Sequence, residues 1–251
     1  MKKNNYLLID YGNSYVKACL YDKTNDQIVE TAQTPKTVNP NDLLSLFDHL
    51  SSFKPDVIIE SNTAVAEYIQ PFNASLSQLF PKAKIKMITR PDFKGLVDLS
   101  NISPSVAIGS DLLVSAYYIT KTIKIGAVCS LGTVYTCIVS KHKQISSCYF
   151  VPSMSKSLKT ISSITTIPRD YIPQKYDEIK GMNTPSCFAA GANFAVSGWL
   201  NKVVKVNKLT SKQLLLTGGD VCRFPSLKKE YKEVKNLILR GLAMLVKEKQ
   251  W

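Results

Sequence analysis

The chain has 251 residues, of which 45% are hydrophobic and 20% are charged, a composition that suits one large or two small soluble domains. No segment has the roughly 18–20 consecutive apolar residues of a membrane helix, so we expect a cytoplasmic protein with no membrane partner. The formal net charge of +13 would attract any polyanion. The lysines are spread along the chain rather than clustered with aromatic residues, which argues against a specific nucleic-acid site.

The first half of the chain predicts alternating strands and helices. Residues 5–22 are an apolar run, a tight turn at Gly12 and Asn13, and an alternating run, which together predict a β-hairpin. The next predicted elements are a helix over 41–53, a strand over 55–61, a helix over 63–72, a strand over 83–89, a loop over 91–105 and a long helix over 109–122.

The second half repeats this theme. Three strands with a glycine turn and a short turn are predicted over 124–150, then helices over 153–161 and 184–204, a strand and glycine turn over 212–220, and a closing helix over 234–248. The repetition predicts two related α/β domains with mixed sheets, residues 1–120 and residues 121–251.

Cysteine usage gives no sign of a metal or disulfide framework. The six cysteines stand among apolar neighbours without a C-x-x-C pair, and the chain has only two histidines. We therefore expect reduced, buried thiols and no zinc site. The cysteines are Cys19, Cys129, Cys137, Cys148, Cys187 and Cys222.

The glycine turn of the first hairpin carries groups that suit a nucleotide phosphate. Such a turn exposes backbone N–H groups, and small polar side chains beside it can bond phosphate oxygens. An acid at the end of the first strand can hold Mg²⁺. The set is Asp10, Gly12, Asn13, Ser14 and, on the following strand, Lys17.

A similar turn begins the second half, although Ser130 stands where the first turn has Asp10. Taken singly, either turn is compatible with an ordinary hairpin. Together with a third glycine turn at 217–220, they would surround a nucleotide, which is the arrangement of the actin-like and sugar-kinase ATPases. The second set is Gly132, Thr133 and Thr136.

Six segments, in the right order, resemble the type III pantothenate kinases, whose relatives include Bvg-accessory-factor-type proteins. The resemblance implies two duplicated ribonuclease H-like domains of the actin-like ATPase fold. It also implies transfer of the γ-phosphate of ATP to pantothenate, the first step of coenzyme A synthesis. The segments are IDYGNSYVKACL, GSDLLVSAYY, SLGTVYT, FVPSMSKSLKTI, GMNTPSCFAAGANFAVSGWL, and LLLTGGD followed by KNLILRGLAML.

The resemblance also implies roles for individual residues. Asp111 matches the general base that accepts the proton of the pantothenate hydroxyl, and Asp10 the acid that positions Mg²⁺. Because Asp111 stands at a helix start, we expect the helix dipole to lower its pKa and favour an orienting role. Family members are homodimers with the substrate site at the interface, and they need K⁺ or NH₄⁺. Phosphate contacts would come from Asn13, Ser14, Gly132 and Thr133, and substrate contacts from Gly109, Ser110 and Thr184.

Three residues depart from the family pattern. Leu112 replaces an arginine expected to hold the pantothenate carboxylate, Ser130 replaces an acid, and Ser153 replaces a glycine. Lys94 or Arg90 could supply the lost positive charge. The departures leave two alternatives open: a member that binds nucleotide or a protein partner without catalysis, and a kinase for another small hydroxylated substrate.

Overall fold

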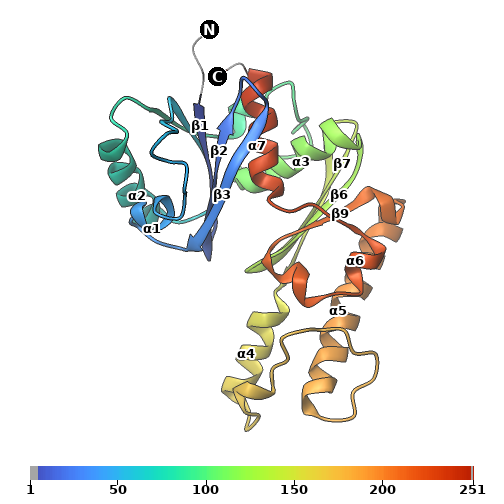
Figure 1. Cartoon of the computed structure of the whole chain (residues 1–251). Coiled ribbons are helices and arrows are strands. Elements are labelled where there is room, and N and C mark those ends of the chain that lie inside the picture. The colour runs from blue at the N-terminus through green and yellow to red at the C-terminus, as the bar shows by residue number, and fades with distance from the viewer. Residues whose placement is uncertain (1–4, 250) are drawn as a thin grey trace. The chain divides into compact units, whose positions relative to one another are not determined.

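The structure, a computed structural model, describes residues 5–249 and residue 251 (Figure 1). The chain forms two compact units. One runs to Tyr118 and takes in the C-terminal segment from Leu237, and the other spans Ile119–Asn236. Each unit is built on a five-stranded mixed sheet flanked by helices, as the sequence predicts.

The sheet of the N-terminal unit has the strand order β3-β2-β1-β4-β5. β1 and β2 form the hairpin expected over residues 5–22, while β4 and β5 add in parallel beside β1. β3 is an additional edge strand whose polar residues alternate between exposed and partly buried positions. The strands are β1 (Asn5–Tyr11), β2 (Tyr15–Asp22), β3 (Gln27–Pro35), β4 (Val57–Asn62) and β5 (Lys84–Met87).

Helices cover both faces of this sheet, and strand alternation decides which residues face which layer. Leu7, Ile9 and Tyr11 of β1 pack with residues of α1 and α2 in one core cluster. Asp10 therefore points to the opposite face, where α7 contacts β1, β2 and β4 (Figure 1). The helices are α1 (Asn41–Leu44), α2 (Ala66–Leu79), the 3-10 turn η1 (Arg90–Phe93), α3 (Ser110–Thr122) and α7 (Leu237–Lys249).

The helix expected over 41–53 is wrong beyond Leu44, where the chain continues in turns. The Glu30 carboxylate accepts the backbone N–H groups of Asp48 and His49 at 3.0 and 3.2 Å, which favours a turn over a continued helix. Phe47 and Phe53 of this segment still reach the core, whereas Leu46 is 50% exposed. The apolar spacing therefore indicated burial for most of these residues but not the backbone conformation.

The second unit repeats the topology of the first. Its sheet has the order β10-β9-β6-β7-β8, and the burial patterns of β6 and β7 are the same, position by position, as those of β1 and β2. The elements are β6 (Ile125–Leu131), β7 (Val134–Lys141), β8 (Gln144–Pro152), α4 (Met154–Ile164), η2 (Arg169–Tyr171), α5 (Thr184–Val206), η3 (Ser211–Gln213), β9 (Leu214–Thr217), η4 (Gly219–Arg223), α6 (Leu227–Glu230) and β10 (Lys232–Glu233).

The closing helix α7 packs in the N-terminal unit, although by chain position it follows the second half. A Cβ atom on Gly241 would overlap Cγ1 of Val114 in α3, so glycine permits the close approach of the two helices. The Tyr117 hydroxyl donates a hydrogen bond to the Met244 carbonyl at 3.3 Å. α7 thus completes the face of the first sheet toward which Asp10 points.

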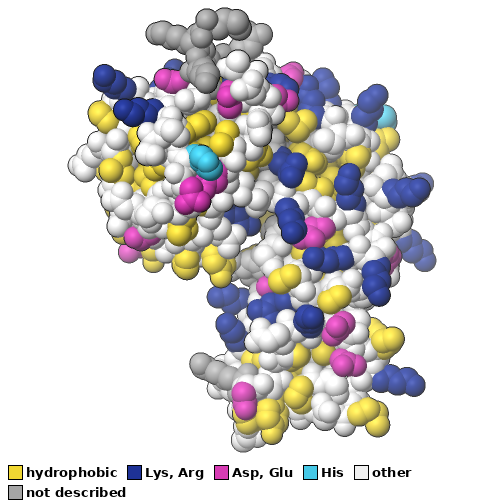
Figure 2. Space-filling view, viewed as in Figure 1, with side chains coloured by type: hydrophobic (Ala, Val, Ile, Leu, Met, Phe, Trp, Pro, Cys, Tyr) yellow, Lys and Arg dark blue, Asp and Glu magenta, His cyan; other side chains and the backbone are white. Residues whose placement is uncertain are grey.

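All six cysteines are free thiols, as expected, but only three of them are buried. Cys19, Cys129 and Cys137 lie in the two cores, and the expectation of burial is wrong for Cys148, Cys187 and Cys222, which are exposed. Cys148 lies on the outer strand β8, and no core layer covers its side. Within residues 5–249, no helix is long and apolar enough to cross a membrane. On the face drawn in Figure 2, lysine and arginine side chains are scattered between hydrophobic and acidic ones.

One ionisable side chain, Glu60 of β4, is buried in the N-terminal core layer beneath α2. Its Oε2 accepts a hydrogen bond from Asn73 Nδ2 at 2.9 Å, whereas its Oε1 has no partner among the described residues. Burial raises the pKa of Glu60 to about 7, and the hydrogen bond from Asn73 only partly opposes this rise. The folded protein therefore retains a proton on Glu60 that the unfolded chain releases.

We expect the unfolding free energy to fall as the pH rises from about 4.5 to about 7, by roughly 3 kcal/mol from Glu60. The sign follows because the folded state binds the proton more tightly over this interval. Urea unfolding at several pH values should show this slope reduced in Glu60→Gln and retained in Glu67→Gln, a control at an exposed position of α2. Equal slopes in wild type and Glu60→Gln would contradict the assignment.

Candidate functional site

The first glycine turn has the tight geometry that its sequence predicts. The Gly12 N–H donates to the Tyr15 carbonyl at 3.0 Å, and a Cβ atom at position 12 would lie 3.1 Å from that oxygen. Asp10 lies at the end of β1, directly opposite Lys17 of β2 and beside Ser61 of β4. Asn13 is exposed, and Ser14 and Lys17 are partly buried.

Ser110 fixes the start of α3 to the end of β4. Its hydroxyl lies 2.9 Å from the Ser61 hydroxyl, accepts the Asn62 N–H at 2.9 Å and contacts the Asn62 carbonyl at 3.0 Å. Because Ser61 is the parallel neighbour of Asp10, this attachment brings Asp111 toward Asp10. Gly109 leaves room for that arrangement, since a Cβ atom there would overlap Oδ1 of Asp111.

Three of the expected residues lie near one another: Lys17 is opposite Asp10 in the hairpin, and Asp111 begins the helix attached at Ser61, the neighbour of Asp10. Burial raises the pKa of Asp10 to about 7, the Lys17 ammonium opposes this shift, and the negative charge of Asp111 adds to it. These interactions require the three charges to lie close together. The first turn and the start of α3, about 100 residues apart in the chain, therefore form one cluster.

Burial also raises the pKa of Asp111, so the expectation that its helix position would lower this pKa is wrong. The backbone N–H groups of Asp111 and Leu112 bond the carboxylate and do lower its pKa. Their effect is smaller than the loss of hydration, because transferring a carboxylate out of water strongly disfavours its charged form. A raised pKa makes the Asp111 carboxylate a stronger base than an exposed aspartate.

The residues of this cluster fit Mg²⁺. Magnesium is commonly held by one or two carboxylates together with substrate phosphates and water. Asp10 and Asp111 supply two carboxylates whose mutual repulsion a cation would relieve. Within the described part of the chain, no group of three or more metal-binding side chains forms a complete protein cage.

The second unit brings its own glycine turns together. Ser130 occupies the same position in β6 as Asp10 in β1, with Thr136 opposite it on β7 and Thr217 beside it on β9. Gly218 has a φ of +107°, and a Cβ atom there would overlap the Leu131 backbone. The third glycine turn therefore packs directly on the end of β6, next to the turn formed by Gly132 and Thr133.

Two further expected positions lie at helix starts. Ser153 is the N-cap of α4, and its hydroxyl accepts the Lys156 N–H at 3.3 Å, which gives this departure from the family pattern a structural role. Thr184 is the first residue of α5 and follows the N-cap Asn183, whose Oδ1 accepts the Ser186 N–H at 3.0 Å. Both caps lie in the second unit.

Leu112, which stands where the family has an arginine, has an apolar side chain that is only 8% exposed. This position therefore supplies no positive charge. Arg90 is committed elsewhere: its guanidinium donates to the backbone carbonyls of residues 102, 103 and 106, in the loop that leads to α3. Lys94 is exposed and forms no ion pair among the described residues. Of the two residues suggested by the sequence, Lys94 is therefore the one whose ammonium group forms no ion pair among the described residues.

Comparison with known proteins assigns the family. The type III pantothenate kinase family model matches residues 6–206, most of the chain. The chain belongs to this family. A type III pantothenate kinase from Malacoplasma penetrans is 23% identical over 249 residues, which cover 95% of this chain and 96% of that protein. One from Mycoplasma mobile is 24% identical over 165 residues, covering 64% and 66%.

Solved structures with low sequence identity confirm the fold of this type III pantothenate kinase family member. A Baf family protein from Campylobacter jejuni aligns with a TM-score of 0.61 at 17% identity, covering 97% of this chain and 98% of the other. MreB 5 of Spiroplasma citri bound to AMPPNP aligns with a TM-score of 0.54 at 7% identity, covering 100% and 98%. These similarities show the actin-like architecture.

The coupling around Asp10 predicts opposite effects of two substitutions. Asp111→Asn removes a negative charge and should lower the pKa of Asp10, whereas Lys17→Gln removes a positive charge and should raise it above about 7. Carboxyl-carbon NMR titration of Asp10 measures both shifts. The control Asp48→Asn, at an exposed position, should leave the titration unchanged, and shifts of the same sign in both test variants would disprove the shared site.

Proposed function

We propose that this family member transfers the γ-phosphate of ATP to the hydroxyl of pantothenate. The observation that carries the proposal is the coupled pair of Asp10 and Asp111 in one site, with Lys17 beside it. A phosphotransferase of this fold needs an acid near the phosphates and a base near the acceptor, and the first unit supplies both. The presence of a bound ATP analogue in the MreB 5 structure supports nucleotide binding by this architecture.

In the proposed reaction, the polar groups of the glycine turns bind phosphate oxygens. The first turn offers the side chains of Asn13 and Ser14, and the second offers Gly132 and Thr133. Lys17, whose charge already acts on Asp10, adds a positive charge near the end of β1. When Mg²⁺ is bound by Asp10, it supplies charge neutralisation at the phosphates.

Asp111 accepts the proton of the substrate hydroxyl at its carboxylate. Burial raises its basicity, while its own N–H and that of Leu112 keep the carboxylate oriented. We assign Ser110 and Gly109 a positioning role, since Ser110 is buried against β4 and a side chain at position 109 would displace the Asp111 carboxylate. Thr184 remains the candidate for a contact with the acyl part of pantothenate, as the family resemblance implies.

Replacing the proposed base tests the assignment directly. With ATP, Mg²⁺ and pantothenate, Asp111→Asn should lower kcat about 10²- to 10⁴-fold, because proton transfer to a positioned base contributes on this scale. Phosphopantothenate formation is the measurement, and Asp48→Asn is the control for loss of a carboxylate elsewhere in the same unit. Full activity of Asp111→Asn, or no product with the wild-type protein, would refute the proposal.

The apolar side chain of Leu112 favours one alternative, a substrate without a carboxylate. Losing an arginine that binds a carboxylate commonly weakens binding by about 2–5 kcal/mol. The alcohol analogue of pantothenate, which has the same hydroxylated part but no carboxylate, separates the two candidates. A higher kcat/KM for the alcohol would assign a substrate lacking the acid. If ATP binds but neither compound is phosphorylated, the non-catalytic alternative stands.

We propose that the monovalent-cation requirement of the family is weakened in this chain. Ser130 supplies a hydroxyl where the family has a carboxylate, and its strand neighbours Thr136 and Thr217 are also uncharged. A hydroxyl can coordinate K⁺ but cannot neutralise its charge. The donor set at this position therefore fits K⁺ poorly. We also propose a homodimer, in line with the family, which sedimentation would test.

We expect exchange of K⁺ for Na⁺ to change the rate by less than about twofold, since charged ligands are the main source of affinity for hard cations. Steady-state kinetics at constant ionic strength measures this effect. The variant Ser130→Asp should gain a K⁺ dependence, and Thr136→Ser provides a control that keeps the local hydroxyl. A strong K⁺ requirement in the wild-type protein would contradict this expectation.

A further inference from the structure

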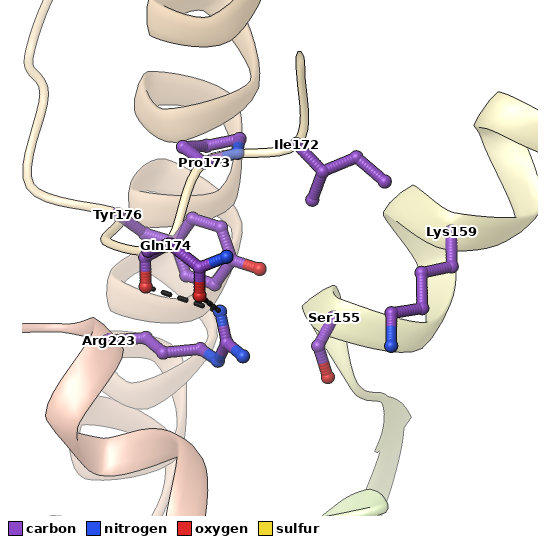
Figure 3. A pocket seen from close by; sticks show the side chains of 7 residues that line it. All are labelled: Ser155, Lys159, Ile172, Pro173, Gln174, Tyr176 and Arg223. Carbon is purple, nitrogen blue, oxygen red and sulfur yellow. Dashed lines mark hydrogen bonds between the residues drawn. The ribbon is translucent and has the colours of Figure 1, made fainter. Parts of the chain in front are cut away.

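The second unit contains a pocket of about 330 Å³ that the proposed phosphoryl transfer does not use (Figure 3). One wall is the first part of α4, another is the loop before α5, and Arg223 at the end of η4 closes a third side. The lining residues are Ser155, Lys159, Ile172, Pro173, Gln174, Tyr176 and Arg223.

Two cationic side chains, Lys159 and Arg223, line this pocket, and no carboxylate is among its lining residues. Asp220, which lies beside it, is already engaged by the Tyr135 hydroxyl at 2.8 Å, the Ser155 hydroxyl at 3.0 Å and Arg223 Nε at 3.1 Å. It balances one of the two cations. The Lys159 ammonium forms no hydrogen bond or ion pair among the described residues, so its charge is available to a ligand. The α4 N-terminus, capped by Ser153, adds a further partial positive charge.

The Arg223 guanidinium is held in place but is not saturated. Its Nη1 donates to the backbone carbonyl and the side-chain Oε1 of Gln174, at 3.2 and 3.5 Å (Figure 3). Its Nε donates to Asp220. No hydrogen bond among the described residues involves its Nη2. The guanidinium thus reaches the pocket already oriented, with one nitrogen free to donate.

The hydroxyl of Tyr176 is a second feature that points to an anionic ligand. Tyr176 is fully buried, and its hydroxyl has no hydrogen-bond partner among the described residues. Figure 3 shows that the hydroxyl points toward the side of the pocket where Ser155 and Lys159 lie. Burial raises the pKa of Tyr176, and the neighbouring Arg223 guanidinium only partly opposes this rise, so the phenol keeps its proton and remains a donor. A buried donor without an acceptor is unfavourable, and an anion entering the pocket would satisfy it.

We propose that this pocket binds a small organic anion with a phosphate or carboxylate head group and a short apolar part. The head group lies among the Lys159 ammonium, Arg223 Nη2 and the Tyr176 hydroxyl, all of which donate hydrogen bonds. The apolar part contacts Ile172 and Pro173. Charge-assisted donors of this kind form the stronger class of hydrogen bonds to anions.

Strand alternation separates the pocket from the second phosphate turn. Tyr135 packs in the core beneath α4 and α5 and bonds Asp220, whereas Thr136 and Ser130 face the other side of the sheet. The glycine-turn residues Gly132 and Thr133 do not line the pocket. The pocket is therefore distinct from the second glycine turn. Asp220, the last residue of the third glycine turn, borders it through Ser155 and Arg223.

Isothermal titration calorimetry of the full-length, nucleotide-free protein tests the proposal. The probes are inorganic phosphate, glycerol 3-phosphate and succinate, so that the phosphate and carboxylate head groups are measured separately. At least one organic probe should bind with one-to-one stoichiometry, and more tightly than inorganic phosphate, because it also contacts the apolar wall. Binding should persist in the presence of saturating AMP-PNP.

Two variants and one control assign the binding to this pocket. Lys159→Gln and Tyr176→Phe should each weaken binding about tenfold, the scale of one charge-assisted hydrogen bond. Lys156→Gln removes the same charge from the same helix outside the pocket and should bind as the wild type does. Tyr176→Phe should unfold at the same or a higher temperature, because it removes an unpaired buried hydroxyl.

Three outcomes would overturn the proposal. The first is the absence of binding by all three probes at millimolar concentrations. The second is unchanged affinity in both Lys159→Gln and Tyr176→Phe, with circular dichroism showing that both variants are folded. The third is displacement of the probe by AMP-PNP, which would place the anion in the nucleotide site.

Discussion

The hydroxyl of Ser110 holds the start of α3 against the end of β4, and the geometry of the candidate site depends on this attachment. Ser110 is buried and contacts both Ser61 and the backbone of Asn62. A buried hydroxyl is stable there only because its bonds replace those it would make with water. Since β4 lies parallel to β1, a helix attached at Ser61 presents Asp111 to Asp10.

The balance of burial against local hydrogen bonds decides the chemistry of these two acids. At Asp111, N–H groups at the helix start favour the carboxylate, and burial disfavours it more strongly. At Asp10, the Lys17 charge favours the ionised carboxylate, and this effect on the pKa is again smaller than the effect of burial. A raised pKa makes each carboxylate a stronger proton acceptor, and a cation bound between the two would favour their ionised forms.

The two units share the same sheet topology, but their equivalent turns carry different polar side chains. β1 and β6 share their burial pattern, and the acid of the first is replaced in the second by Ser130. The end of β6 packs against Gly218, whose positive φ lets the turn after β9 approach the Leu131 backbone closely. On the opposite face of the same sheet, Asp220 ties the second hairpin to the pocket that we propose binds an anion. One sheet thus separates the side proposed to face phosphate from the pocket on its other face.

The sequence by itself determined the order of most strands and helices, the repeated theme and the identity of the turn residues, because hydrophobic periodicity and glycine turns are local features. It did not predict the edge strands β3 and β10. The sequence did not predict that α7 packs in the first unit, that the helix ends at Leu44, or that Arg90 donates to backbone carbonyls. These outcomes depend on partners distant in the chain, such as Val114 for Gly241 and the 102–106 loop for Arg90. The raised pKa of Asp111 was also decided only by tertiary structure, since the sequence shows the helix start but not the layers that exclude water from it.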